Sequence, residues 1–181
     1  DTFNTAVGAD AGLSVTTGVQ NTLIGGLAGD ALTDADNNVA VGYKALSADT
    51  LGTDSVAIGL QALRDQNFTT ATASHNIAIG RDAGVVITTG IRNTLIGGLA
   101  GDALTDADSN VAIGYLALSG DTLGSKSTAI GVGALESQNF TTATDAYNTA
   151  VGFDAGVGIT TGIRNAFLGA EAGAANTTGE S

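Results

Sequence analysis

Two acidic motifs carry residue types that bind hard cations. The tetrapeptide Thr-Asp-Ala-Asp occurs at 33–36 and again at 105–108. In an extended chain, alternate side chains share a face, so both carboxylates of each motif would point the same way. Calcium needs several further oxygen ligands beyond such a pair. We weigh a bound Ca²⁺ ion against a structural role as solvated turn residues, and expect no other cofactor. The candidate ligands are Asp34, Asp36, Asp106 and Asp108.

Residues with the potential for catalysis are few. His75 is the single histidine, and Tyr147 takes its place in the next repeated block, so no Ser-His-Asp arrangement repeats. The glycine-rich segments at 25–29 and 97–101 lack the Gly-Lys-Ser/Thr that completes a phosphate-binding loop. We therefore expect that the chain is not an enzyme.

The heptapeptide QNFTTAT, at 66–72 and 138–144, is a candidate for surface binding. It lengthens its repeat unit by four residues, and loops on rigid scaffolds often carry binding sites. Phe68 and Phe140 have two interpretations: exposed anchors for the face of a sugar, or rings that pack beneath the loop and close the fold. The first makes them receptor contacts and the second makes them structural.

Composition excludes several classes of protein. The 181 residues include 18 acidic and six basic side chains, for a net charge of −12. This balance argues against nucleic acid as a partner, since nucleic-acid binding needs clustered Lys and Arg. The absence of cysteine excludes disulfides and Cys-ligated metals. No apolar run approaches the roughly 18 residues of a membrane span, so we expect no membrane insertion by this segment.

Internal repetition is the strongest signal in the sequence. Residues 21–52 and 93–124 differ at only four of 32 positions, at an offset of 72. The repeated blocks start near Asn4, Asn76 and Asn148, the third being partial. Because no linker divides the blocks, we predict a single repeat domain over residues 1–181.

Each block divides into shorter coils. The phrase Asn/Ser-x-Ala/Leu-Val/Ile-Gly opens nine of the ten coils, and the tenth opens with the related Asn-Ala-Phe-Leu-Gly. The spacing between coils is constant except that the fourth and eighth coils are longer. We number positions within a coil from its opening residue. Coils 1 to 10 begin at Asn4, Asn21, Asn38, Ser55, Asn76, Asn93, Asn110, Ser127, Asn148 and Asn165.

A coil of about 17 residues is too short for a helix–turn–helix repeat, which needs about 33 or more. Its opening phrase alternates as a strand does, and the invariant glycine at position 5 suits a turn with positive φ. We predict a second short strand with turns in the other half of each coil, and a structural hydrogen-bonding role for the opening asparagines. Stacked coils of this kind form an all-β parallel β-solenoid.

Both faces of the opening strand are apolar, which predicts that both are buried. Position 3, mostly alanine, would line a narrow interior, and position 4 would lie on the opposite face. A single solenoid has one interior, so the position-4 stripe predicts that chains associate around it. The stripe comprises Val7, Ile24, Val41, Ile58, Ile79, Ile96, Ile113, Ile130, Val151 and Leu168.

The phrases Asn-Val-Ala-Val-Gly at 38–42, Ser-Val-Ala-Ile-Gly at 55–59 and Ser-Thr-Ala-Ile-Gly at 127–131 resemble the YadA-like head repeats of trimeric autotransporter adhesins. The longer phrase at 4–25 resembles repeats of bacteriophage tail fibres. The resemblance covers the whole chain, although the adhesin head coil is shorter than the coils of this sequence. It implies a left-handed β-roll and a homotrimer, intertwined or side by side, with the position-4 stripe on the threefold axis.

The resemblance also implies a function and a location. We expect a structural segment of an extracellular fibre, on a cell surface or a virion, that serves attachment to a host. Its partners would be two further copies of itself and a host surface or glycan receptor. The alternative is a carbohydrate-binding or surface-binding module that uses the QNFTTAT loops.

Overall fold

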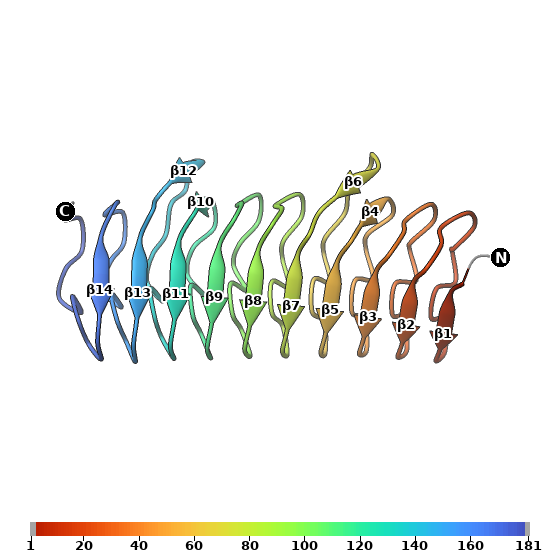
Figure 1. Cartoon of the computed structure of the whole chain (residues 1–181), viewed down its shortest axis with the longest axis horizontal. Coiled ribbons are helices and arrows are strands. Elements are labelled where there is room, and N and C mark those ends of the chain that lie inside the picture. The colour runs from red at the N-terminus through yellow and green to blue at the C-terminus, as the bar shows by residue number, and fades with distance from the viewer. Residues whose placement is uncertain (1–2, 180–181) are drawn as a thin grey trace.

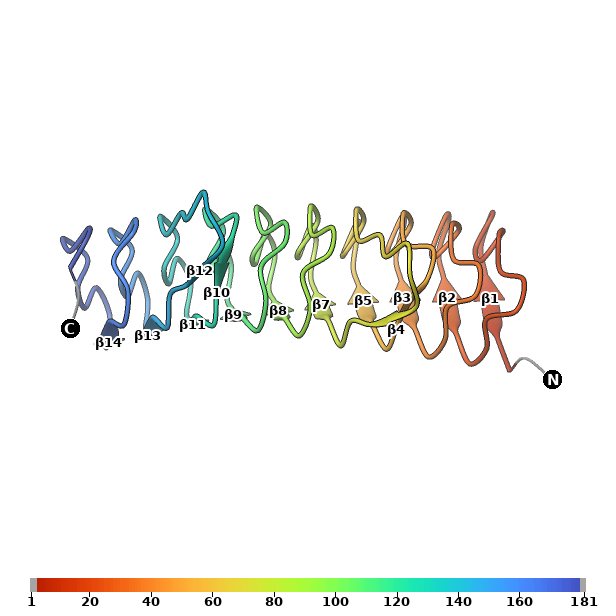
Figure 2. The same cartoon turned by 90° about the horizontal axis from the view of Figure 1, so that it is seen from above.

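The computed structural model describes residues 3–179 and confirms the prediction of a parallel β-solenoid. None of these residues is helical, and the chain winds through a continuous row of coils (Figure 1). Seen from above, the coils remain in register from one end to the other (Figure 2). At about 4.8 Å between neighbouring strands, ten strands extend over roughly 45 Å.

One ten-stranded sheet runs the length of the solenoid, and every neighbouring pair in it is parallel. Each strand covers positions 2 to 4 of its coil, as the alternation predicts. Equivalent positions pair directly, so that Val39, for example, lies opposite Val56. The strands are β1 (Thr5–Val7), β2 (Thr22–Ile24), β3 (Val39–Val41), β5 (Val56–Ile58), β7 (Ile77–Ile79), β8 (Thr94–Ile96), β9 (Val111–Ile113), β11 (Thr128–Ile130), β13 (Thr149–Val151) and β14 (Ala166–Leu168).

The second strand predicted for every coil forms in only four of them. The pairs are β4 (Gly52–Thr53) with β6 (Thr72–Ala73), and β10 (Gly124–Ser125) with β12 (Thr144–Asp145). The two pairs form where a lengthened coil follows a coil of ordinary length, because its added residues bring a second extended segment beside Gly52–Thr53 or Gly124–Ser125. Elsewhere the second half of the coil is a series of turns and bends. Backbone hydrogen bonds between successive coils still satisfy these turns.

The position-5 glycines form an obligatory column along one corner. Gly97 has a φ of +137°, and a Cβ atom there would overlap the carbonyl of Gly114 in the next coil. A left-handed conformation and this close stacking both exclude other residues.

The interior is narrow, and its residues alternate in size. The position-3 alanines from the third coil onward, such as Ala40 and Ala112, are fully buried, whereas Ala6 in the first coil is exposed. This confirms the predicted strand faces. Where position 3 is leucine, as at Leu23 and Leu95, position 9 is glycine and leaves room for the larger side chain. Complementary volumes therefore fill the lumen largely without aromatic residues.

A column of asparagines closes the interior on its polar side. Asn93 Oδ1 accepts a 3.0 Å hydrogen bond from the backbone N–H of Asn110 in the next coil. Its Nδ2 donates at 2.7 Å to the carbonyl oxygen of Ala107. Both groups of the buried carboxamide are thereby paired, which confirms the structural role predicted for these residues.

Candidate functional site

The outward face of the ten-stranded sheet carries the position-4 stripe. The structure places the stripe outside the lumen, on the face opposite the buried position-3 side chains. Ile24, in the second strand of the sheet, remains 39% exposed, and Ile79, in the middle of the sheet, remains 36% exposed. Residues 3–179 therefore provide no layer over this apolar row. We call this surface the strand face.

Position 2 widens the strand face, because residues two apart in a strand point the same way. Val39, Val56, Ile77 and Val111 add apolar side chains beside the stripe, and threonine occupies this position in five other strands. Position 6, just past the glycine corner, adds exposed larger side chains. These are Tyr43, Leu60, Tyr115, Val132 and Phe153.

The two lengthened coils project as arms at the edge of the solenoid from which the strands start (Figure 1). We define the arms as residues 67–73 and 139–145. Phe68 and Phe140, at their bases, are only 5% and 6% exposed. Their interpretation as exposed receptor contacts is therefore wrong, and each ring packs beneath its arm instead. Gly52 makes the space, since a Cβ atom there would lie 2.8 Å from the Phe68 ring.

A buried polar network anchors each arm, and sequence reasoning missed it. Asp49 Oδ1 accepts 3.0 Å hydrogen bonds from the backbone N–H groups of Gly52 and Phe68, and its Oδ2 accepts one from Gln66. Burial raises the pKa of the Asp49 carboxyl, against the opposing effect of these donors. The carboxylate thus fixes the residue from which the arm begins.

The same network continues the hydrogen bonding of the asparagine column at the coil that opens with serine in place of asparagine. Coil 4 opens with Ser55, whose side chain is too short to reach the next coil. Gln66 fills the gap: its Nε2 donates to Ser55 Oγ at 2.9 Å, and its Oε1 accepts from Asn76 Nδ2 at 2.8 Å. The second block repeats this arrangement with Asp121, Ser127, Gln138 and Asn148. The sequence does carry a signal for this network. Position 12 is polar in the coils that form it, whereas half of the coils have Val, Leu or Ile there.

The four candidate calcium ligands bind the preceding coil. Asp34 Oδ1 accepts a 2.7 Å hydrogen bond from Thr17 Oγ1, and Asp36 Oδ1 accepts one at 2.8 Å from the Val19 backbone N–H. Asp106 and Asp108 repeat both bonds in the second block. Within residues 3–179, no three or more acidic or histidine side chains gather in a metal-binding group. A calcium site at these residues stays a prediction.

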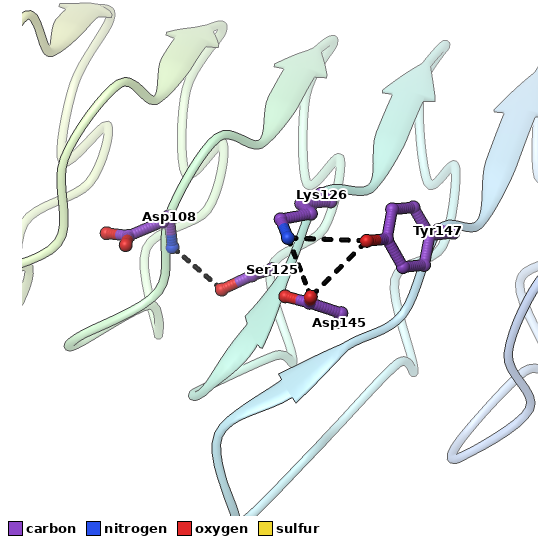
Figure 3. Close-up of polar contacts among 5 residues, drawn as sticks. All are labelled: Asp108, Ser125, Lys126, Asp145 and Tyr147. Atoms are coloured by element: carbon purple, nitrogen blue, oxygen red, sulfur yellow. Dashed lines mark hydrogen bonds and ion pairs between the residues drawn. The ribbon is translucent and has the colours of Figure 1, made fainter.

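The second arm has an ion pair at its base that the first lacks (Figure 3). Lys126 Nζ lies 2.6 Å from Asp145 Oδ2 and 3.3 Å from the Tyr147 hydroxyl, with the ammonium 5.3 Å from the ring centroid. Hydrogen bonding to Lys126 lowers the pKa of Asp145. The equivalent residues of the first block are Asp54, Ala73 and His75, so only the second arm is held this way.

Two half-buried carboxyls face the turns of neighbouring coils without full hydrogen bonding. One oxygen each of Asp30 and Asp102 is buried, and within residues 3–179 neither atom has a hydrogen-bond partner. Burial raises the pKa of both side chains, and the charges of Asp10 and Asp82 add to the effect. These raised pKa values predict that the stability of the folded chain depends on pH.

Among the residues that the structure describes, no pocket opens on the surface and no helix is long and apolar enough to cross a membrane. Comparison with family models, curated proteins and solved structures finds no match to this chain. The strand face and the two arms are the candidate functional surfaces of the described residues.

Proposed function

We propose that this chain is a structural segment of an extracellular homotrimeric fibre that serves attachment to a host or surface. The observation that carries the proposal is the strand face, a continuous apolar row that no part of residues 3–179 covers. Soluble monomers seldom expose a patch of this extent. The proposal assigns the chain no catalytic role.

The occupant we assign to the strand face is a second and third copy of the same chain. Every position along the face repeats at the spacing of one coil, so copies in register would match each apolar residue with an equivalent one. The number three and the left-handed winding come from the resemblance of the opening phrase to adhesin head repeats. Three sheets packed around one axis would bury the position-4 stripe together with the valine and isoleucine side chains of position 2.

The proposed mechanical role follows from the hydrogen-bond pattern. Backbone bonds and the asparagine column run parallel to the long axis in nearly every coil. A rod built this way resists bending and leaves few exposed backbone groups for a protease. The near-identity of the first two blocks suits extension in length better than a unique active site.

The test is the mass of the full chain in solution, measured by light scattering after size exclusion. A mass of three chains supports the proposal. A folded monomer would overturn it, and a stable dimer would overturn the threefold arrangement.

A second candidate, a glycan-binding module, is favoured by the arms. Thr69, Thr70, Thr141 and Thr142 are exposed at equivalent places in the two blocks. Binding of the intact chain on a glycan array, lost when these threonines become alanine, would support this role. Unchanged binding by the variant would count against the arms.

A further inference from the structure

We propose that Asn67 and Asn139 are acceptor sites for N-linked glycosylation. Each begins an Asn-Phe-Thr triplet, which satisfies the Asn-x-Ser/Thr pattern of such acceptors. The triplets lie at the bases of the two arms, on the side from which both arms project (Figure 1). The substrate class is an activated sugar, linked to a nucleotide or to a lipid diphosphate.

The backbone places both required side chains of the triplet in solvent. Asn67 and Thr69 are exposed, whereas Phe68 between them is 5% exposed. No strand includes these residues, and a bend begins at Thr69. The buried ring therefore anchors the middle of the triplet, while the side chains on either side of it remain exposed. Asn139, Phe140 and Thr141 repeat the pattern.

The two ends of the Asn67 carboxamide differ in their hydrogen bonding. Asn67 Oδ1 accepts a 3.2 Å hydrogen bond from Thr50 Oγ1. Within residues 3–179, Asn67 Nδ2, the nitrogen to be modified, makes no hydrogen bond. A sugar on Nδ2 would leave the bond to Thr50 intact, so the fold accommodates the modification. Asn139 and Thr122 have the same relationship at 3.3 Å.

The position in the coil sets these asparagines apart. Position 13 is threonine in the other eight coils, and asparagine replaces it only at the base of each arm. Backbone hydrogen bonds from Asn67 to Thr88 and from Phe68 to Asp49 fix the start of the triplet. Thr69 lies beyond these bonds, in the exposed part of the arm, where a transferase can reach its hydroxyl.

A third triplet provides a comparison within the same chain. Asn176-Thr177-Thr178 also fits the pattern. Its asparagine is half-buried, and Asn176 Oδ1 accepts a 3.1 Å hydrogen bond from the Gly179 backbone N–H across the turn. We expect this site to be modified less than the two arm sites.

The transfer step balances as a substitution at the anomeric carbon. Asn67 Nδ2 attacks that carbon, and the bond from the carbon to the phosphate oxygen of the donor breaks. The phosphate-bearing carrier leaves with the bonding electrons, and a base of the transferase takes one proton from the nitrogen. No oxidation or reduction occurs.

The experiment treats the folded full chain with a soluble sequon-specific N-glycosyltransferase and UDP-glucose, followed by peptide mass spectrometry. We expect hexose on Asn67 and Asn139, with Asn176 modified less. A control sequon peptide is modified in the same tube. Unmodified Asn67 and Asn139 beside a modified control peptide would overturn the proposal, as would hexose found on Thr69 or Thr70 instead.

Matched variants assign the modification to single sites. Thr69→Val should abolish the glycopeptide containing Asn67 and leave that of Asn139, while Thr69→Ser should retain it. Thr141→Val should give the reverse result. Retained modification of Asn67 in Thr69→Val would contradict the assignment. A second experiment, in which the chain is secreted from yeast, tests transfer from the lipid-linked donor. These readouts do not depend on oligomeric state, so they can fail without the fibre proposal failing.

Discussion

Gln66 Nε2 donates a 2.6 Å hydrogen bond to Asp49 Oδ2 from one coil to the next, and both side chains are fully buried. Several other coils place an apolar residue at this position, for example Leu32 or Ile87. At the coil from which the first arm projects, this pair replaces apolar packing with a hydrogen-bonded network. It therefore fixes where the first arm starts, and Gln138 and Asp121 do the same for the second.

Replacing Asp49 with asparagine should destabilise the fold. Every partner of the Asp49 carboxylate is a donor, so an amide nitrogen would face Gln66 Nε2 with no acceptor between them. We expect a loss of about 1–3 kcal/mol in the free energy of unfolding. Urea denaturation measures it. Asp106→Asn, at an exposed carboxylate, is the control and should change stability by less than about 0.5 kcal/mol. Equal effects would contradict the network.

Replacing Gly97 with alanine should be among the most damaging small changes. The backbone strain of about 1–3 kcal/mol adds to overlap with Gly114. Two controls separate the causes. Gly169 has a φ of +116° and open space around a Cβ atom, so Gly169→Ala tests strain alone. Gly98→Ala would place its Cβ 3.5 Å from the Tyr115 ring and should be nearly neutral. Thermal unfolding ranks the three, and any other order would contradict the stacking argument.

Replacing Ile96 with aspartate should prevent assembly. Copies of the chain packed on the strand face would bury several carboxylates close together without partners. Light scattering should show the mass of a single chain. Thr94 shares the strand face and is no control, whereas Ser137→Asp changes an exposed residue outside the sheet. If both variants assembled as the unmodified chain does, the strand face would not be the interface.

The raised pKa of Asp102 predicts a pH dependence of stability. The folded state holds this proton more tightly than the unfolded state, whose pKa is about 3.9. The free energy of unfolding should therefore fall as pH rises from that value through the folded pKa, and stay lower above it. Asp102→Asn should make the profile measured by urea denaturation between about pH 3.5 and pH 7 less steep, while Asp30 and Asp49, whose pKa values are also raised, keep part of the slope. Ser119→Ala, at the same position of the next coil, should leave the slope unchanged, and an unchanged slope in Asp102→Asn would contradict the assignment.

Removing the Lys126 ammonium should raise the pKa of Asp145 toward its ordinary value. Lys126 and Asp145 are exposed, so the change tests local electrostatics more than stability. Because the folded pKa is depressed, the contribution of the pair is present at neutral pH and is lost as pH falls through that pKa. Carbon NMR titration of the Asp145 carboxyl in Lys126→Gln measures the shift. An unchanged midpoint would show that the pair does not form in solution.

The sequence predicted the solenoid because its signals are local and repeated ten times. Alternation in segments such as 39–41 determines which side chains face inward, and the invariant glycine determines the corner. The second strand was predicted too widely, because the residue types of that half tolerate strands and turns alike, and the pairing there depends on the added residues of the lengthened coils. The position-4 stripe was located correctly, while its occupant stays a prediction.

Features that depend on contacts between coils needed the tertiary structure. By itself, the sequence determined the number of coils, the two faces of the strand and the places where coils lengthen. Only the structure decided that Phe68 and Phe140 are buried and that Gln66 completes the asparagine column. The physical reason is distance along the chain: a ring at the base of an arm is buried or exposed according to the coil stacked against it, here by the space above Gly52.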